Sequence, residues 1–267
     1  MIGYYFSYWT ISLLLLVLIW QKYKTTQVYF PGLMVFVLAG FLSVFLASRY
    51  NALVLTFSDF YPGYPIPRMN EIYGFLICAG LGEEGFKFLA CLFASLAICY
   101  LGKRKVRSLD ILLGSILVGA IFALLENLIA YLPILDSFDM FRRSYMPVPI
   151  HMSMGAMHGI TLIFWFRYMQ RYEKLGIFVI PIAGCILFTG YLVTVLFHTL
   201  YDVFSIFISY FIEKLENQGI LETIEHSMLP TELWAIPFIL LMLVFVFYIW
   251  KYTNENEIIY PFEVFDE

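Results

Sequence analysis

Seven apolar stretches, each long enough to cross a lipid bilayer, constrain this chain more than any other feature. A spanning helix needs about 20 predominantly apolar residues, because the hydrocarbon core of a bilayer is roughly 30 Å thick. We therefore expect an all-α, polytopic transmembrane bundle of about seven spans around a polar intramembrane cavity. The seven stretches are 4–20, 31–48, 72–100, 109–132, 150–169, 177–212 and 232–250.

The sixth stretch, 177–212, is too long for one straight crossing at 1.5 Å per residue. Pro181, Gly184 and Gly190 could kink or break it and so create a partial eighth span. A single crossing and a broken one both remain open at this point.

The composition supports a membrane protein and excludes other classes. Hydrophobic residues make up 61% of the chain and charged residues 13%, whereas a soluble domain has about 25% charged residues. The net charge of -4 is small and spread out, so we expect a lipid bilayer and no nucleic acid as partner. The four cysteines all lie in apolar stretches, which favours small buried hydrophobic side chains over disulfides. The first stretch lacks a basic flank and a small-residue cleavage site, which favours a retained span.

Lysines and arginines in the predicted loops indicate the orientation, because cytoplasmic loops carry an excess of them. Alternate loops carry ten basic residues against five on the opposite side, so we expect the N-terminus outside and the C-terminus in the cytoplasm. We expect one membrane domain over 1–252, with a motif core at 78–204, and a short acidic cytoplasmic tail over 253–267. The ten basic residues are Lys22, Lys24, Lys103, Arg104, Lys105, Arg107, Arg167, Arg171, Lys174 and Lys251.

The third stretch contains Glu83, Glu84 and Lys87, charges that cost several kcal/mol at membrane depth unless they are paired or face water. Glu83 and Lys87 are four residues apart, so one helix face can hold them as an ion pair. Glu84 then points about 100° away, towards another helix. We therefore expect Lys87 to hold Glu83 and Glu84 to act as a general base. A purely structural network of salt bridges is the alternative.

Three later stretches also place polar side chains at membrane depth. Gly155 and Gly159 follow His151 at four-residue intervals, and such small residues allow a partner helix to approach closely. We expect His158 to be a packing or supporting residue. The polar side chains of these stretches are Glu126 and Asn127, then His151 and His158, and then His198 and Asp202.

Ionisable groups inside a membrane face the bundle interior or a water-filled cavity, so one shared site is the simplest interpretation. Glutamate and histidine around one water are typical of a hydrolase, which needs a general base and a group that stabilises the oxyanion. A proton-coupled transporter or a non-proteolytic scaffold would use similar clusters, and both remain alternatives. The sequence contains no HExxH motif, which excludes a conventional zincin site.

Four motifs, in order and on separate predicted helices, resemble those of the PrsW intramembrane proteases, relatives of the CAAX prenyl protease and bacteriocin-processing superfamily. Glu83-Glu84-Gly85-Phe86-Lys87 is similar to EExxK, and Phe122 to Asn127 is similar to FxxxEN. His151 with Gly155 resembles HxxxG, and His198 with Asp202 resembles HxxxD.

The resemblance implies a membrane-anchored protein substrate, similar to an anti-sigma factor, cut on its external side by a protease of a bacterial cell membrane. It implies that Glu83 or Glu84 activates water with His151, and that Lys87 holds the other glutamate. His198, positioned by Asp202, would bind a metal or stabilise the oxyanion, and Glu126 and Asn127 would complete the site. Glu84, His151 and His198 are then the expected ligands of a divalent metal such as zinc, with a metal-independent mechanism as the alternative.

Overall fold

The computed structural model describes residues 30–58, 72–101, 106–131, 147–217 and 258–259. The described chain is almost entirely helical, which confirms the predicted fold class. Two turns, η1 and η2, are π-helical, and η3 is a 3₁₀ helix. The elements are α2 Phe30–Ser58, η1 Phe75–Glu83, α4 Glu84–Leu101, β1 Val106–Arg107, α5 Ser108–Glu126, η2 Asn127–Tyr131, α7 Pro147–Arg171, η3 Glu173–Phe178, α8 Val179–Asn217 and β2 Ile258–Ile259.

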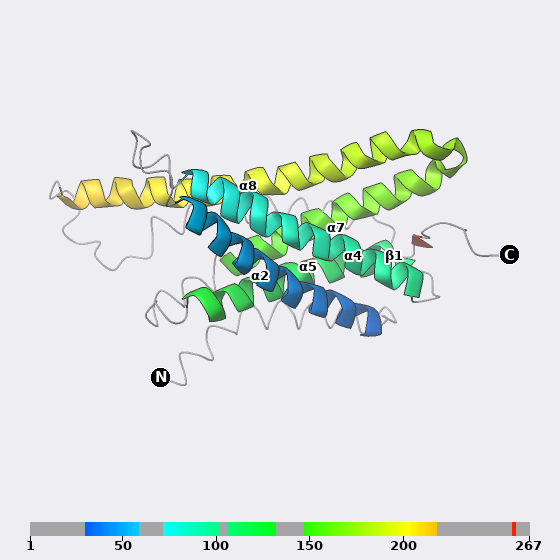
Figure 1. The fold of residues 1–267 in the computed structure, drawn as a ribbon, viewed down its shortest axis with the longest axis horizontal. Coiled ribbons are helices and arrows are strands. Elements are labelled where there is room, and N and C mark those ends of the chain that lie inside the picture. Colours follow the sequence, from blue (N-terminus) through cyan, green and yellow to red (C-terminus); the bar gives the residue numbers. More distant parts are fainter. Residues whose placement is uncertain (1–29, 59–71, 102–105, 132–146, 218–257, 260–267) are drawn as a thin grey trace.

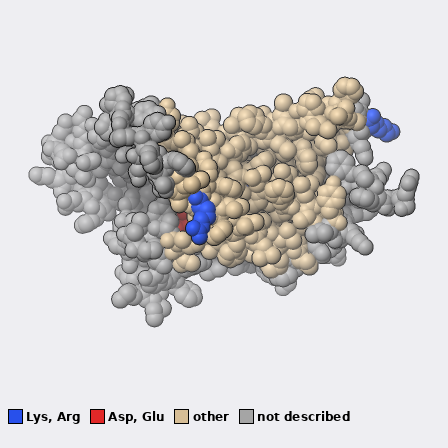
Figure 2. All heavy atoms as spheres, in the orientation of Figure 1, with Lys and Arg blue, Asp and Glu red and all other residues tan. Residues whose placement is uncertain are grey.

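Three helices of the described part are long and apolar enough to cross a membrane: Pro31–Val54, Ser108–Ile129 and Gly176–Ser205. The face seen in Figure 2 carries few charged side chains over its described surface, as expected for a surface that contacts lipid. The predicted first and last spans, 4–20 and 232–250, lie outside the described residues, so the count of about seven stays a prediction.

The long helices lie side by side in one elongated bundle (Figure 1). α5 packs most extensively on α7 and also contacts α2 and α4. Glycines make the α5–α7 contact close: a Cβ atom at Gly119 would lie 2.2 Å from the His151 carbonyl oxygen, and one at Gly155 would lie 2.3 Å from the Ser115 carbonyl oxygen. The predicted packing role of the small residues after His151 is thereby confirmed.

α8 runs as one continuous helix from Val179 to Asn217, without the break that the sequence left open. Pro181 lies in the first turn of this helix, where a missing N–H costs no intrahelical hydrogen bond. Gly190 serves packing instead, since a Cβ atom there would lie 2.1 Å from Thr161 Oγ1 on α7.

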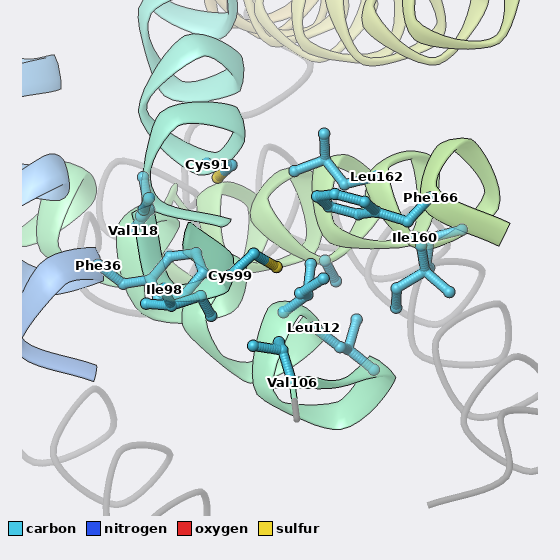
Figure 3. Close-up of a cluster of buried hydrophobic side chains, with 14 of the residues drawn as sticks. Phe36, Cys91, Ile98, Cys99, Val106, Leu112, Val118, Ile160, Leu162 and Phe166 are labelled. Atoms are coloured by element: carbon cyan, nitrogen blue, oxygen red, sulfur yellow. The ribbon is translucent and has the colours of Figure 1, made fainter. Parts of the chain in front are cut away.

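The apolar core fills the end of the bundle near β1 (Figure 3). Cys91 and Cys99 are buried in this core as free thiols, which confirms the prediction for these two. Its labelled members in Figure 3 are Phe36, Cys91, Ile98, Cys99, Val106, Leu112, Val118, Ile160, Leu162 and Phe166. The polar motifs are therefore left to the other end, which we call the site end.

Two short strands join distant parts of the chain at the end opposite the site. β1 and β2 pair antiparallel, with Val106 opposite Ile259 and Arg107 opposite Ile258. Residues 258–259, the described part of the predicted tail, thus pair with the residues just before α5, which the sequence analysis did not predict.

Candidate active site

Both glutamate motifs lie at junctions between α-helical and π-helical turns. Glu83 ends η1 and Glu84 begins α4, while Glu126 ends α5 and Asn127 begins η2. π turns are rare and occur frequently at functional sites. They shift the register, so that residues on either side of a junction do not follow the spacing of an ordinary α-helix.

Neighbouring helices stabilise η1 through close contacts. Tyr191 Oη, on α8, donates a 2.9 Å hydrogen bond to the Leu81 carbonyl. A Cβ atom at Gly80 would lie 2.3 Å from Thr199 Oγ1, and one at Gly82 would lie 2.5 Å from the Tyr50 ring. The two glycines of Gly80-Leu81-Gly82 therefore allow α8 and α2 to touch the backbone that presents Glu83.

The Glu84 side chain is completely buried, and its carboxylate contacts three other side chains. Its side chain is 0% exposed, and it forms an ion pair with Lys87. His158 Nε2 lies 3.0 Å from Glu84 Oε2, and His198 Nδ1 lies 2.6 Å from Glu84 Oε1. Three partners from three helices thus hold this one carboxylate.

The expected pairing of Lys87 with Glu83 is therefore wrong. Glu84 and Lys87 are three residues apart and both lie in the first turn of α4. Residues three and four apart are both neighbours on a helix, so the spacing alone does not decide whether Glu83 or Glu84 pairs with Lys87. Glu84, which we expected to face away as a free base, is the partner of the lysine.

Lys87 links the first three motifs. Its Nζ lies 2.9 Å from His151 Nδ1 and 4.3 Å from the centre of the Phe122 ring. An ammonium has only donors, so His151 Nδ1 accepts. A neutral His151 then carries its proton on Nε2, which lies 3.0 Å from Glu126 Oε2.

Glu83 lies with His151 and His198 around a common point. One carboxylate oxygen and one ring nitrogen from each histidine all lie within 4.8 Å of one another, close enough to hold a metal ion. The structure thus places Glu83, instead of the predicted Glu84, in the group that can bind a metal. The histidine rings are 5.1 Å apart and nearly perpendicular.

The donor set fits a catalytic zinc-type ion, because two histidines and one glutamate are a known ligand set for such sites. His198 uses Nδ1 on Glu84, so Nε2 is the ring nitrogen that could bind a metal. This Nε2 lies 3.7 Å from Asp202 Oδ2, beyond hydrogen-bond distance but consistent with the predicted ion pair. His151 needs one adjustment: its Nε2 proton must leave, or move to Nδ1, before Nε2 can act as a ligand.

The sequence analysis missed one residue of the site, Asn51, and gave another, His158, too small a role. Asn51 Nδ2 donates a 3.2 Å hydrogen bond to Glu83 Oε1. The predicted second stretch ends at residue 48, but α2 continues to Ser58 and so includes Asn51. His158, expected only to support or pack, contacts Glu84 directly. Asn127 is buried at the junction of α5 and η2, as its place in the second motif predicts.

The fold and the site together define the class of this protein. It is a helical membrane protein in which carboxylates and imidazoles from several helices meet at one site, and these are the residue types of a hydrolase. Residues 30–249 match the PrsW family of intramembrane metalloproteases, and the chain belongs to this family. The predicted family is therefore confirmed. No curated protein and no solved structure matches the chain.

Proposed function

We propose that this protein is an endopeptidase that cuts a membrane-anchored protein at the site end of the bundle. The observation that carries the proposal is the convergence of Glu83, His151 and His198 within 4.8 Å of one another, from three separate parts of the chain. Such a cluster offers a general base and cationic or metal-bound groups for an oxyanion, which peptide hydrolysis requires.

The burial of the three glutamates divides their roles. Glu84 is sealed among Lys87, His158 and His198 and cannot reach a substrate, so it orients the site. The Glu126 side chain is 16% exposed and contacts His151, so it is our candidate for the base that removes a proton from water.

Glu83, His151 and His198 are the residues that would hold a divalent metal such as zinc. When bound in such a site, zinc supplies a water of lowered pKa and polarises the scissile carbonyl. The chain's own residues supply the orientation. Glu84 fixes the His198 ring and Asn51 holds Glu83, while Lys87 orients the His151 ring in the form that carries its proton on Nε2. Partners of this kind are commonly worth a factor of 10–100 in metal affinity or activity.

The positions of the basic residues support an external site. Arg107, Arg167, Arg171 and Lys174 all lie at the end of the bundle opposite Glu84 and Glu126, where α4 ends and α7 ends. The positive-inside rule then places the site end outside the cell. An external site suits a substrate similar to an anti-sigma factor in a bacterial cell membrane, as the sequence resemblance implies.

The test compares newly formed protein N-termini in membranes of cells that produce the wild type, Glu83→Gln or Asp110→Asn. Asp110 lies at the opposite end, where it pairs with Arg107, and serves as a matched carboxylate control. New N-termini next to a membrane span should appear with the wild type and Asp110→Asn and disappear with Glu83→Gln. If membranes with the wild type and with either variant contain the same new N-termini, the proposal is overturned and a carrier or scaffold is favoured.

A further inference from the structure

A large apolar groove lies between α7 and α8. It has a volume of about 820 Å³. Its deep end reaches Met157 and Val193, and its other end opens beside the last turn of α7. The contact between Gly190 and Thr161 brings the two helices together at the deep end, and η3 connects α7 to α8 at the other end.

Positive charge is confined to one end of this groove. Arg167 and Arg171 line that end, four residues apart and thus on one face of α7. Tyr168 and Tyr172 accompany them, and the Arg171 guanidinium lies 5.7 Å from the centre of the Tyr172 ring. No residue described as lining the groove is acidic. Arginine with tyrosine is typical of the level where a membrane meets water.

The remainder of the lining is apolar or weakly polar. Phe164 and Ile182 are 51% and 53% exposed, a high value that suits side chains in contact with lipid. Cys185 and Thr189 lie on the opposite wall, on α8. The groove therefore has a cationic interfacial end and an oily interior.

We propose that this groove binds an anionic phospholipid, with the phosphate against Arg167 and Arg171 and an acyl chain along the wall towards Met157 and Val193. A phospholipid has one charged end and one apolar end, which matches the groove in both chemistry and direction. Basic pockets between membrane helices are known to hold anionic headgroups. A transmembrane helix in the groove would not need a negative charge beside Arg167 and Arg171, whereas a phospholipid carries its phosphate at that level.

The test is native mass spectrometry of the full-length protein in dodecylmaltoside micelles containing phosphatidylglycerol or phosphatidylcholine. We expect retention of phosphatidylglycerol to exceed that of phosphatidylcholine by about tenfold. The double variant Arg167→Gln/Arg171→Gln should remove this difference. Arg49→Gln is the matched control, because Arg49 also lies over an aromatic ring, that of Phe45, but at the site end. It should retain lipid as the wild type does.

A second variant keeps the test independent of the arginines. Thr189→Trp adds bulk inside the groove from an exposed position, so it should reduce retention of phosphatidylglycerol with both arginines intact. Equal retention of the two lipids, or full retention by the double variant, would overturn the proposal.

Cys185 reports directly on whether the groove is open. Among the four cysteines, all of which the structure describes, only Cys185 is exposed. In a Cys78→Ser background, maleimide should modify Cys185 rapidly in lipid-free micelles and several-fold more slowly with phosphatidylglycerol, but not with phosphatidylcholine. If Cys185 is already protected without lipid, a protein segment fills the groove and the proposal is wrong.

Discussion

The carboxylate of Glu84 forms a buried ion pair with the ammonium of Lys87, three residues further along the same helix. Both side chains are 0% exposed, and the pair also contacts all three histidines of the cluster: Glu84 contacts His158 and His198, and Lys87 contacts His151. The first motif therefore contributes one enclosed glutamate that organises the site and one, Glu83, that faces the candidate metal position.

This difference predicts opposite phenotypes for two adjacent substitutions. Glu84→Gln leaves the Lys87 ammonium buried without its counter-charge, and breaking such a pair costs about 3–5 kcal/mol. Glu83→Gln removes one ligand and leaves the pair intact. We expect Glu84→Gln to lower the thermal unfolding temperature strongly, and Glu83→Gln to abolish cleavage with little change in stability. Thermal unfolding in detergent, read beside a membrane cleavage assay, checks both. A stable, active Glu84→Gln protein would contradict the assignment.

Metal content separates the three histidines. His151 and His198 belong to the group around the common point, whereas His158 contacts Glu84 and is not a member of that group. We expect zinc bound to the purified wild type to fall by at least about tenfold in His198→Ala and His151→Ala. Elemental analysis after dialysis gives the measurement.

His158→Gln is the matched variant for this experiment. It should retain most of the metal but lose stability, because a buried hydrogen bond to a charged group is worth roughly 1.5–3 kcal/mol. Activity should disappear with a chelator and return with zinc. Equal metal loss in all three histidine variants would show that the ligand set is wrong.

The close contact of α5 with α7 makes Gly119 a position where a single methyl group reaches the site. A Cβ atom there would lie 2.2 Å from the carbonyl oxygen of His151, so the backbone that carries this histidine must move. Overpacking of this kind costs about 1–3 kcal/mol. Gly119→Ala should lower both the unfolding temperature and activity.

Gly184→Ala is the control for that substitution, since a Cβ atom at Gly184 meets nothing within 4 Å. Alanine is a better helix former than glycine, so this variant should be neutral or slightly more stable. If Gly119→Ala and Gly184→Ala unfold at the same temperature, the close contact between Gly119 and the His151 backbone is contradicted.

The sequence predicted the helical class and the motif residues because long apolar runs and buried charges carry strong physical constraints. It assigned the partners within the first motif wrongly, because residues three and four apart are both helix neighbours and the spacing cannot choose between them. The choice depends on contacts with other helices, such as that of Glu83 with Asn51. Continuity of α8 could have been inferred, since a proline in a first helical turn is well tolerated.

Asn51 shows another limit of the sequence. It lies upstream of all four motifs, and its role depends on the packing of α2 beside η1, which no periodicity reveals. The pairing of β1 with β2 is likewise a contact between segments about 150 residues apart, outside the range of local signals.

Asn51 should act as a positioning residue for Glu83. Its Nδ2 donates to Glu83 Oε1, while its Oδ1 is buried and has no hydrogen-bond partner among the described residues. Asn51→Leu keeps the approximate size and removes the donor, so we expect metal affinity and activity to fall by about 10–100-fold. Titration with zinc and a cleavage assay measure the two effects. Because leucine is apolar and the site is only partly buried, the unfolding temperature of the metal-free protein should change little. Ser43→Ala is the control on the same helix, since the Ser43 hydroxyl donates to the Gly40 carbonyl within α2, at 2.8 Å. If both variants bind zinc as the wild type does, Glu83 does not depend on α2 for its position.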